Sequence, residues 1–297
     1  MTDKLSGVVT ALVTPMENDK GDPKEDVLRK LVDFQIDSGI HGLFILGTAG
    51  EGPKLDLARR KAVAEIVVDQ AAGRIPVIVH IGSANTEDCE DLAKHAENIR
   101  ATHVSAVGPW YYSYDLPGLI YHYKAIANAT SLPVLVYNNN GRQGYNITAK
   151  MFMAIAEAAP GIVGVKDTSH SVAQIGDYYK LFKDRWQILI GGDGIMLPGL
   201  IHGAVGEVNT ISNAFPKIPL QIYESYMKGD MQKAREAQVL ANKVRDLLKN
   251  GPYLTPYKEV VKLIGFDTGE ISRPLRPMTE VEKEFLKEGL KELGLLS

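Results

Sequence analysis

Cysteine is almost absent from this chain of 297 residues, since Cys89 is its only one. One thiol cannot form a disulfide within the chain, so a disulfide framework is excluded, as is a zinc site built from several cysteines. No histidine accompanies His80 at the His-x-x-x-His spacing of a metal motif. His95 and His122 lie on predicted helices and are expected at the surface. We therefore expect no metal in the site and a fold held by an ordinary hydrophobic core.

An excess of charge of one sign is also lacking. The 36 acidic residues nearly balance the 33 basic ones, which leaves a net charge of −3 and a pI near 6.2. This balance provides no basic surface for nucleic acid or anionic lipid. No apolar run is long enough to span a bilayer, and the N-terminus lacks the apolar core of a signal peptide. We expect a cytoplasmic protein whose partners are small molecules, with neither nucleic acid nor membrane among them.

What the sequence does contain is a regular alternation of short apolar runs and amphipathic segments. The repeat of roughly 20 to 34 residues is that of a βα unit. The predicted strands are 8–13, 42–46, 77–81, 103–107, 134–137, 162–166, 187–190 and 206–211. The predicted helices between them are 24–38, 56–72, 86–99, 119–128, 148–159, 172–182 and 196–202, the first one capped by Asp22-Pro23. Eight such units predict an α/β protein with a (β/α)8 barrel.

A doubly wound open sheet alternates in the same way, but it usually has a glycine-rich turn after its first strand. Here Thr14-Pro15-Met16-Glu17 follows that strand, which favours the barrel. After residue 215 only helices are predicted, at 216–228, 231–250, 255–264 and 280–295. We assign 1–215 to the barrel domain and 216–297 to a C-terminal helical extension, packed on the barrel or on another subunit.

Lys166 ends the apolar strand Gly161-Ile-Val-Gly-Val-Lys166. An ammonium at the mouth of a buried strand is partly desolvated, which lowers its pKa and makes the neutral amine available to attack a carbonyl. The alternative is a lysine that reaches solvent from a strand end. In a (β/α)8 barrel the active site lies at the C-terminal ends of the strands, and this favours the first interpretation.

The other predicted strand ends carry groups suited to carbonyl chemistry on a carboxylated substrate. They are Gly47-Thr48-Ala49-Gly50-Glu51-Gly52, His80, Trp110-Tyr111-Tyr112, Tyr137-Asn138-Asn139-Asn140-Gly141-Arg142, Gly191-Gly192-Asp193-Gly194 and Asn209-Thr210. Each has a structural alternative, because tyrosines pack readily at strand ends, glycines form tight turns, and a lone histidine such as His80 is more often packed than functional.

Taken together, three motifs resemble one family. Gly47-Thr48-Ala49-Gly50-Glu51, Tyr137-Asn138 followed by Arg142-Gln143-Gly144, and Gly164-Val165-Lys166-Asp167 stand in the order and spacing of the dihydrodipicolinate synthase/N-acetylneuraminate lyase family. These are class I, Schiff-base pyruvate aldolases and include the 2-keto-3-deoxygluconate aldolases. The similarity runs over the whole chain. It implies a homotetramer of (β/α)8 barrels, with pyruvate as the nucleophilic half-substrate and no cofactor.

The resemblance also implies roles for single residues. Lys166 forms the Schiff base, Tyr137 is the general acid and base, Thr48 is the relay threonine, and Tyr111 is the relay tyrosine that reaches a neighbouring subunit. The Thr48 and Ala49 amides hold the pyruvate carboxylate. The remaining substrate-binding positions are Asn139, Arg142, Gly192, Asp193 and Val208.

The second substrate stays open at this point. Arg142 matches the arginine with which the synthases hold a carboxylate, which favours aspartate semialdehyde as the acceptor. Ala49 in place of a second threonine, Tyr114 after the tyrosine pair, and the triplet 138–140 favour a 2-keto-3-deoxy sugar acid. We predict a 2-keto-3-deoxygluconate-type aldolase, with dihydrodipicolinate synthase as the alternative. Because no lysine or arginine flanks Gly191–Gly194, we expect no phosphate on the substrate. A barrel with a binding role and no catalysis is the third possibility.

Overall fold

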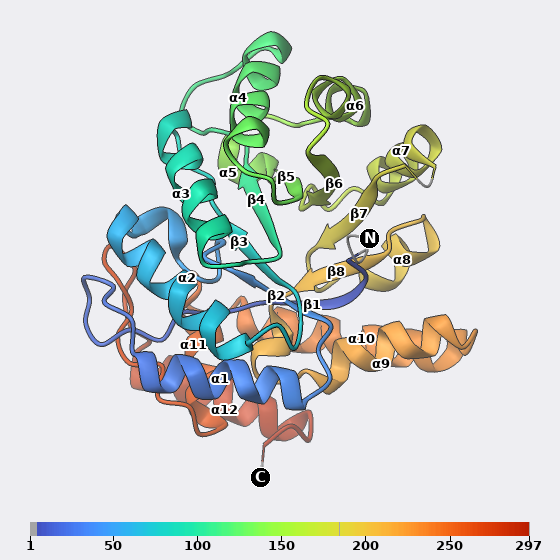
Figure 1. The fold of residues 1–297 in the computed structure, drawn as a ribbon. Helices are drawn as coiled ribbons and strands as arrows, with labels where there is room; N and C mark the ends of the chain where they lie inside the picture. Colours follow the sequence, from blue (N-terminus) through green and yellow to red (C-terminus); the bar gives the residue numbers. More distant parts are fainter. Residues whose placement is uncertain (1–4, 184, 297) are drawn as a thin grey trace.

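The computed structural model describes residues 5–183 and 185–296, and its eight strands close into a parallel barrel (Figure 1). The strands are β1 (Gly7–Ala11), β2 (Gly42–Ile45), β3 (Val77–His80), β4 (His103–Val107), β5 (Val134–Asn138), β6 (Ile162–Asp167), β7 (Gln187–Gly191) and β8 (Gly206–Asn209). Each strand pairs with the next, and β8 pairs with β1 to close the ring. The predicted barrel is confirmed.

Helices connect the strands and cover the outside of the barrel (Figure 1). They are α1 (Glu25–Asp37), α2 (Leu57–Ala71), α3 (Thr86–Asn98), α4 (Leu116–Ala129), α6 (Ala149–Ala158), α7 (Val172–Phe182) and α8 (Met196–Ile201). Five of them, α2, α3, α4, α6 and α7, each begin after a side chain that accepts a hydrogen bond from a backbone N–H of the first turn, as Asp56 does from Arg59 at 2.8 Å. These caps satisfy N–H groups that have no partner within the helix.

The predicted start of the first helix was wrong in detail. Lys24 precedes α1 and makes no side-chain cap. Asp22 instead accepts hydrogen bonds from Asn18 and Arg59, while Pro23 forms an isolated β-bridge with Met16. The Asp22 carboxylate therefore joins the β1–α1 connection to α2, because a charged arginine binds it more strongly than a neutral backbone N–H would.

Four helices follow the barrel and lie along one side of it, in orange and red in Figure 1. They are α9 (Lys217–Met227), α10 (Met231–Leu248), α11 (Thr255–Leu263) and α12 (Glu280–Glu292). The α9 and α10 helices pack on each other and on α8, and α12 contacts both α10 and α11. The boundary at residues 215 and 216 stays a prediction, because this block shares its apolar packing with the barrel helices.

Two apolar layers follow from the alternation of side chains along each strand. One layer lies between the strands and the surrounding helices. The other fills the barrel interior and includes Val9, Phe44, Ile78, Leu135 and Leu189. Since every second residue of a strand faces inward, the interior layer sets which side chains at the strand ends can enter the site.

One surface prediction was wrong. His122 is buried on α4, and its Nδ1 lies 2.9 Å from the Thr86 hydroxyl at the start of α3, because α3 and α4 pack together along this face. His95 remains partly exposed and lies 2.8 Å from Glu65. None of the helices in the described part of the chain combines the length and apolar character needed to cross a bilayer.

Candidate active site

The side chain of Lys166 points into the barrel. Its backbone is in register with Tyr137 on β5 and with Leu189 on β7, and both of these belong to the interior layer. The next residue, Asp167, faces outward, where it accepts hydrogen bonds from Asn138 and Gln174. One-residue alternation on β6 thus separates a lysine that faces the barrel interior from a carboxylate that bonds to the surrounding structure.

Two aromatic rings enclose the Lys166 ammonium. Its Nζ lies 3.7 Å from the centroid of the Tyr137 ring and 4.1 Å from that of Phe44. Burial lowers the pKa of Lys166, and the neighbouring Tyr137 and Asp193 only partly oppose this effect. A lowered pKa raises the fraction of neutral amine, which is the form that attacks a carbonyl.

The Tyr137 hydroxyl accepts a hydrogen bond of 2.9 Å from the Asn139 side-chain amide. Burial disfavours its phenolate, but the charge of Lys166 and the nearby hydroxyls of Thr168 and Thr48 outweigh burial, so the pKa of Tyr137 lies below its ordinary value. A phenol with a lowered pKa, next to the amine, can exchange a proton with a bound substrate.

The turn after β2 offers unpaired backbone donors to the same cavity. In the part of the chain that the structure describes, the N–H groups of Thr48 and Ala49 donate no hydrogen bond. A backbone hydrogen bond closes the turn, because the N–H of Gly52 donates to the Gly47 carbonyl at 3.2 Å. Adjacent free N–H groups form a binding site for an anion such as a carboxylate.

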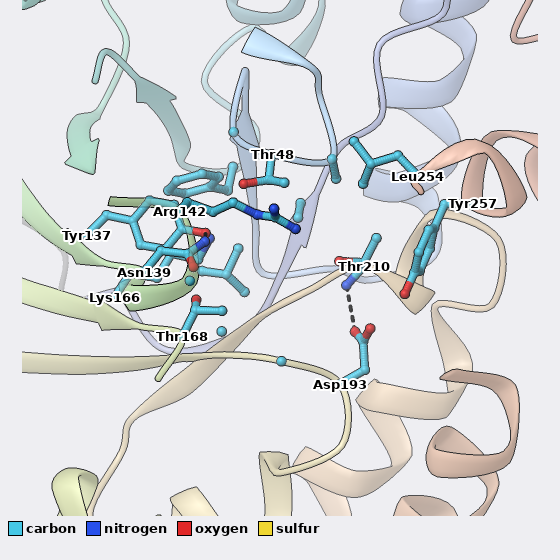
Figure 2. Close-up of a pocket in the computed structure, with 18 of the residues that line it drawn as sticks. Thr48, Tyr137, Asn139, Arg142, Lys166, Thr168, Asp193, Thr210, Leu254 and Tyr257 are labelled. Carbon is cyan, nitrogen blue, oxygen red and sulfur yellow. Dashed lines mark hydrogen bonds between the residues drawn. The ribbon is translucent and has the colours of Figure 1, made fainter. Parts of the chain in front are cut away.

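These residues line one cavity of about 400 Å³ at the C-terminal end of the barrel (Figure 2). Tyr137, Asn139 and Lys166 lie on one side of it, and Thr210, Leu254 and Tyr257 lie on the other. The cavity brings together the predicted residues Thr48, Ala49, Tyr137, Asn139, Arg142, Lys166, Gly192, Asp193 and Val208. Its size suits a small organic substrate.

Arg142 reaches across the cavity between these two sides (Figure 2). It lies on α5 (Asn140–Gln143), a single helical turn that the sequence did not predict and that ends at Gly144 in the left-handed conformation. The guanidinium stacks on Tyr253, 4.4 Å from the ring centroid. Among the described residues it forms no ion pair, so its hydrogen-bond donors are available to a bound anion.

Asp193 lines the cavity but directs its carboxylate at the backbone. Its Oδ1 accepts a hydrogen bond of 2.7 Å from the N–H group of Thr210 (Figure 2). The N–H group of Ile211 donates to the same oxygen at 3.3 Å. Gln238 on α10 donates to the Asp193 carbonyl at 3.0 Å. Asp193 therefore connects the turn after β7 with β8 and the C-terminal helices. Gly192 precedes it with φ of 141°, a conformation that favours glycine.

Tyr111 lies outside this cavity. Its side chain is 86% exposed, stands edge-on to Tyr112 with 5.0 Å between the ring centroids, and has a left-handed backbone with φ of 83°. Left-handed backbone is unfavourable for a bulky residue. A role for Tyr111 in a neighbouring subunit stays a prediction.

Several residues that line the cavity were not predicted from the sequence. Phe44 is an ordinary inward residue of β2, and nothing in its sequence context marks it. The others are Thr168, His170, Arg245, Lys249, Tyr253, Leu254 and Tyr257. Most of these belong to the C-terminal block, whose helical pattern shows apolar and polar faces but not which strand ends they meet. His80 is buried, and its Nδ1 lies 3.1 Å from the Leu46 carbonyl, in agreement with a packed histidine.

Comparison with known proteins agrees with this geometry. Residues 4–293 match the Dihydrodipicolinate synthetase family. An uncharacterized DapA-like lyase of Halobacterium salinarum is 35% identical over 98% of this chain and 95% of its own length. A 4-hydroxy-tetrahydrodipicolinate synthase of Methanopyrus kandleri is 33% identical over 99% and 98%. The crystal structure of YagE, a prophage protein of E. coli K12 in complex with pyruvate, has a TM-score of 0.93 at 26% identity and covers 98% of this chain and 99% of its own.

The match spans nearly all of the chain and of its relatives, and the barrel and the order of the motifs agree with it. The chain therefore belongs to the dihydrodipicolinate synthetase family of pyruvate-dependent carbon–carbon lyases.

Proposed function

We propose that this enzyme is a Schiff-base aldolase that forms or cleaves 2-keto-3-deoxy sugar acids of the 2-keto-3-deoxygluconate type. The observation that carries the proposal is the Lys166 ammonium, buried between the Phe44 and Tyr137 rings with a lowered pKa. YagE, which shares this fold, binds pyruvate. The unpaired N–H groups of Thr48 and Ala49 suit the pyruvate carboxylate.

In the proposed reaction, the neutral Lys166 amine adds to the pyruvate ketone, and loss of water gives an iminium ion. Loss of a proton from the methyl group converts it to an enamine. The enamine carbon attacks the aldehyde and forms the new C–C bond, while the Tyr137 phenol gives its proton to the developing alkoxide. Water then hydrolyses the iminium, which releases a 4-hydroxy-2-keto acid and regenerates the amine.

The preference for a polyhydroxylated acceptor rests on the side chains around the cavity. Its walls carry amide and hydroxyl groups from Asn140, Thr168, Thr210, Tyr253 and Tyr257. Such groups both donate and accept hydrogen bonds, as sugar hydroxyls do.

Dihydrodipicolinate synthase activity is the second candidate. Arg142, with its free donors over the cavity, favours an acceptor that carries a carboxylate, as aspartate semialdehyde does. The synthase of M. kandleri is among the relatives. A third candidate is a barrel that binds ligands without catalysis. Trapping of a covalent pyruvate adduct distinguishes it from the two enzymes.

Borohydride reduction in the presence of pyruvate tests the shared chemistry. Intact-mass analysis should find one covalent adduct per chain in the wild type and none in Lys166→Ala. An adduct that persists in Lys166→Ala, or its absence from the wild type, would refute the aldolase. Turnover of pyruvate with glyceraldehyde, against aspartate semialdehyde, then separates the two substrates; a clear preference for the semialdehyde favours the synthase.

Tyr111 enters the proposal through a second subunit. We propose a homotetramer in which Tyr111 completes the proton relay of a neighbouring site, since an exposed aromatic pair with a strained backbone suits an interface. Sedimentation analysis of the wild type checks this. A fully active monomer would exclude a role for Tyr111 across a subunit boundary.

A further inference from the structure

We propose that Arg245 and Lys249 form a subsite for a terminal phosphate on the aldehyde half of the substrate. The inference deepens the proposed aldolase function and rests on it. Both side chains line the same cavity as Lys166, although they come from α10 and the residue just after it, far beyond the barrel strands. They stand one helical turn apart, so they project from the same side of the helix.

Arg245 lies directly against the glycine-rich turn after β7. A Cβ atom added to Gly194 would be 1.6 Å from Nη1 of Arg245, so the guanidinium occupies the space that a side chain at position 194 would need. The Nε and Nη2 atoms donate to Asp246 Oδ1 at 2.9 and 2.7 Å. Among the described residues Nη1 has no hydrogen-bond partner, which leaves a donor free at the cavity wall.

Among the described residues, the Asp246 carboxylate binds Arg245 through Nε and Nη2 and leaves Nη1 to the subsite. Its side chain is 64% exposed, and an ion pair in contact with water contributes little. His170 also lies at this wall, where its ring would meet a Cβ atom on Gly192 at 2.7 Å. Burial and the charge of Lys249, with a smaller contribution from Arg245, hold the pKa of His170 below its ordinary value. Arg245 and Lys249 therefore bring positive charge to the cavity wall at which His170 lies.

The charges along the cavity favour a dianion at this end. Besides the Lys166 amine, three cationic side chains line it, from Arg142, Arg245 and Lys249, against one acidic side chain, from Asp193. The Asp193 carboxylate is already bound to backbone N–H groups. The carboxylate of pyruvate compensates one positive charge, and a phosphate, with about two negative charges near pH 7, compensates the rest. An acceptor carboxylate could be held by Arg142 alone.

This proposal differs from the expectation drawn from the sequence. No lysine or arginine flanks Gly191–Gly194 along the chain, and a phosphorylated substrate was therefore disfavoured. The packing of α10 on α8, together with the hydrogen bond from Gln238 to the Asp193 carbonyl, brings Arg245 to that turn through space. The ligand class that fits is a phosphorylated polyhydroxyaldehyde, or the 2-keto-3-deoxy acid that contains it.

The test compares acceptors in the full-length enzyme with pyruvate as the donor. For glyceraldehyde 3-phosphate we expect a kcat/KM about tenfold or more above that for glyceraldehyde. The double variant Arg245→Gln/Lys249→Gln should lose this preference. The matched control is Arg235→Gln/Lys243→Gln, which removes the same charge from exposed positions of α10 outside the cavity. It should retain the preference.

Gly194→Ala provides an independent variant. It keeps every charge but displaces the Arg245 guanidinium, and it too should lower the preference for the phosphorylated acceptor. The proposal is overturned if the wild type shows no preference, or if the preference survives in the double variant. It is also overturned if the double variant instead loses activity selectively with aspartate semialdehyde, because the subsite then holds a carboxylate.

Borohydride trapping with pyruvate alone separates this inference from the proposed function, since it needs no acceptor. If the adduct forms in the wild type and in all variants, but the wild type shows no preference for the phosphorylated acceptor, only the subsite is refuted. If no adduct forms in the wild type, the aldolase itself is refuted.

Discussion

The side-chain amide of Asn139 donates a hydrogen bond of 2.9 Å to the hydroxyl of Tyr137, two residues earlier in the chain. The two residues share the end of β5, where the strand passes into the single turn α5. Asn139 was predicted to bind substrate. That role stays a prediction. With its donor directed at Tyr137, Asn139 also orients the proposed acid and base and stabilises the phenolate, since a hydrogen bond to a charged oxygen favours the charged form.

Asn139→Ala should therefore raise the pKa of Tyr137. We expect a decrease in kcat of about tenfold to a hundredfold, in line with the loss of one hydrogen bond to a charged group. In the cleavage direction Tyr137 must accept a proton, so the acidic limb of the pH profile of kcat/KM should move to higher pH. Asn140→Ala removes an amide that makes no hydrogen bond to Tyr137 and should leave this limb in place. An unchanged limb in Asn139→Ala would contradict the assignment.

Arg142→Ala should affect the two acceptors differently. The guanidinium can form two charge-assisted hydrogen bonds with a carboxylate, so kcat/KM for aspartate semialdehyde should decrease about a hundredfold. For glyceraldehyde, which has no carboxylate, a decrease of less than about tenfold is expected. Steady-state kinetics with both aldehydes, and trapping of the pyruvate adduct as a control for folding, measure this difference. Equal losses would show that Arg142 acts on the architecture of the site and not on an acceptor carboxylate.

Lys258 should be more important for stability than the nearby Lys54. Both contact Glu51, which follows the Thr48 turn, but Lys258 is only 5% exposed and Lys54 is 25% exposed. Lys258→Met leaves a buried carboxylate with one partner fewer, and we expect a loss of about 3 kcal/mol in the free energy of unfolding. Lys54→Met should cost about 1 kcal/mol or less. Denaturant titration measures both, and equal costs would contradict the prediction.

The same variant should weaken pyruvate binding. Glu51 also accepts a hydrogen bond of 2.5 Å from Ser272, so this carboxylate joins the proposed carboxylate-binding turn to the C-terminal block. The KM for pyruvate should rise in Lys258→Met and return toward the wild-type value in the double variant Glu51→Gln/Lys258→Met, in which position 51 carries no buried charge. An unchanged KM in Lys258→Met would contradict the prediction. It would show that the ion pair stabilises the fold without affecting the geometry of the turn.

Glu207 should make the protein less stable as the pH rises. It is fully buried on β8, and among the described residues only Asn209 donates to its carboxylate, at 2.8 Å. Burial, reinforced by the charge of Asp193, raises the pKa of Glu207 well above its ordinary value of 4.5. The folded state therefore keeps a proton that the unfolded state releases above about pH 4.5, and the free energy of unfolding falls as the pH increases from there.

Glu207→Gln should remove this dependence, because the amide stays neutral at every pH. The difference in unfolding free energy between Glu207→Gln and the wild type should grow in favour of the variant between pH 5 and pH 8. Denaturant titrations at these two pH values check the sign. A difference that is constant with pH would show that Glu207 is ionised in the folded protein.

Much of the fold follows from local patterns. The period of the apolar runs predicted all eight strands of the barrel, and the capping side chains at Asp56 and Thr148 explain why two of the helices begin where they do. Lys166 could be singled out because a lysine at the end of an apolar strand is conspicuous. These signals depend on residues close together in the chain, so they can be recognised without the tertiary structure.

Other parts of the site could not be predicted in this way. The aromatic enclosure of Lys166 depends on Phe44, a residue of another strand whose inward direction follows only from the closure of the barrel. The direction of the Asp193 carboxylate depends on the N–H groups of Thr210 and Ile211, which donate hydrogen bonds to it. Asp193, which was predicted to contact the substrate, thereby binds the backbone of another segment. The sequence of its own loop does not show this contact.

The sequence by itself determined the barrel, its C-terminal active-site face and the lysine at the end of β6, because strand alternation and strand length are local properties. The tertiary structure alone decided that Arg245 meets the turn after β7 and that Gln238 donates to the Asp193 carbonyl there. These contacts join residues through the packing of α10 against the barrel helices. Helix packing depends on how whole apolar faces fit together, and no short segment of sequence contains that information.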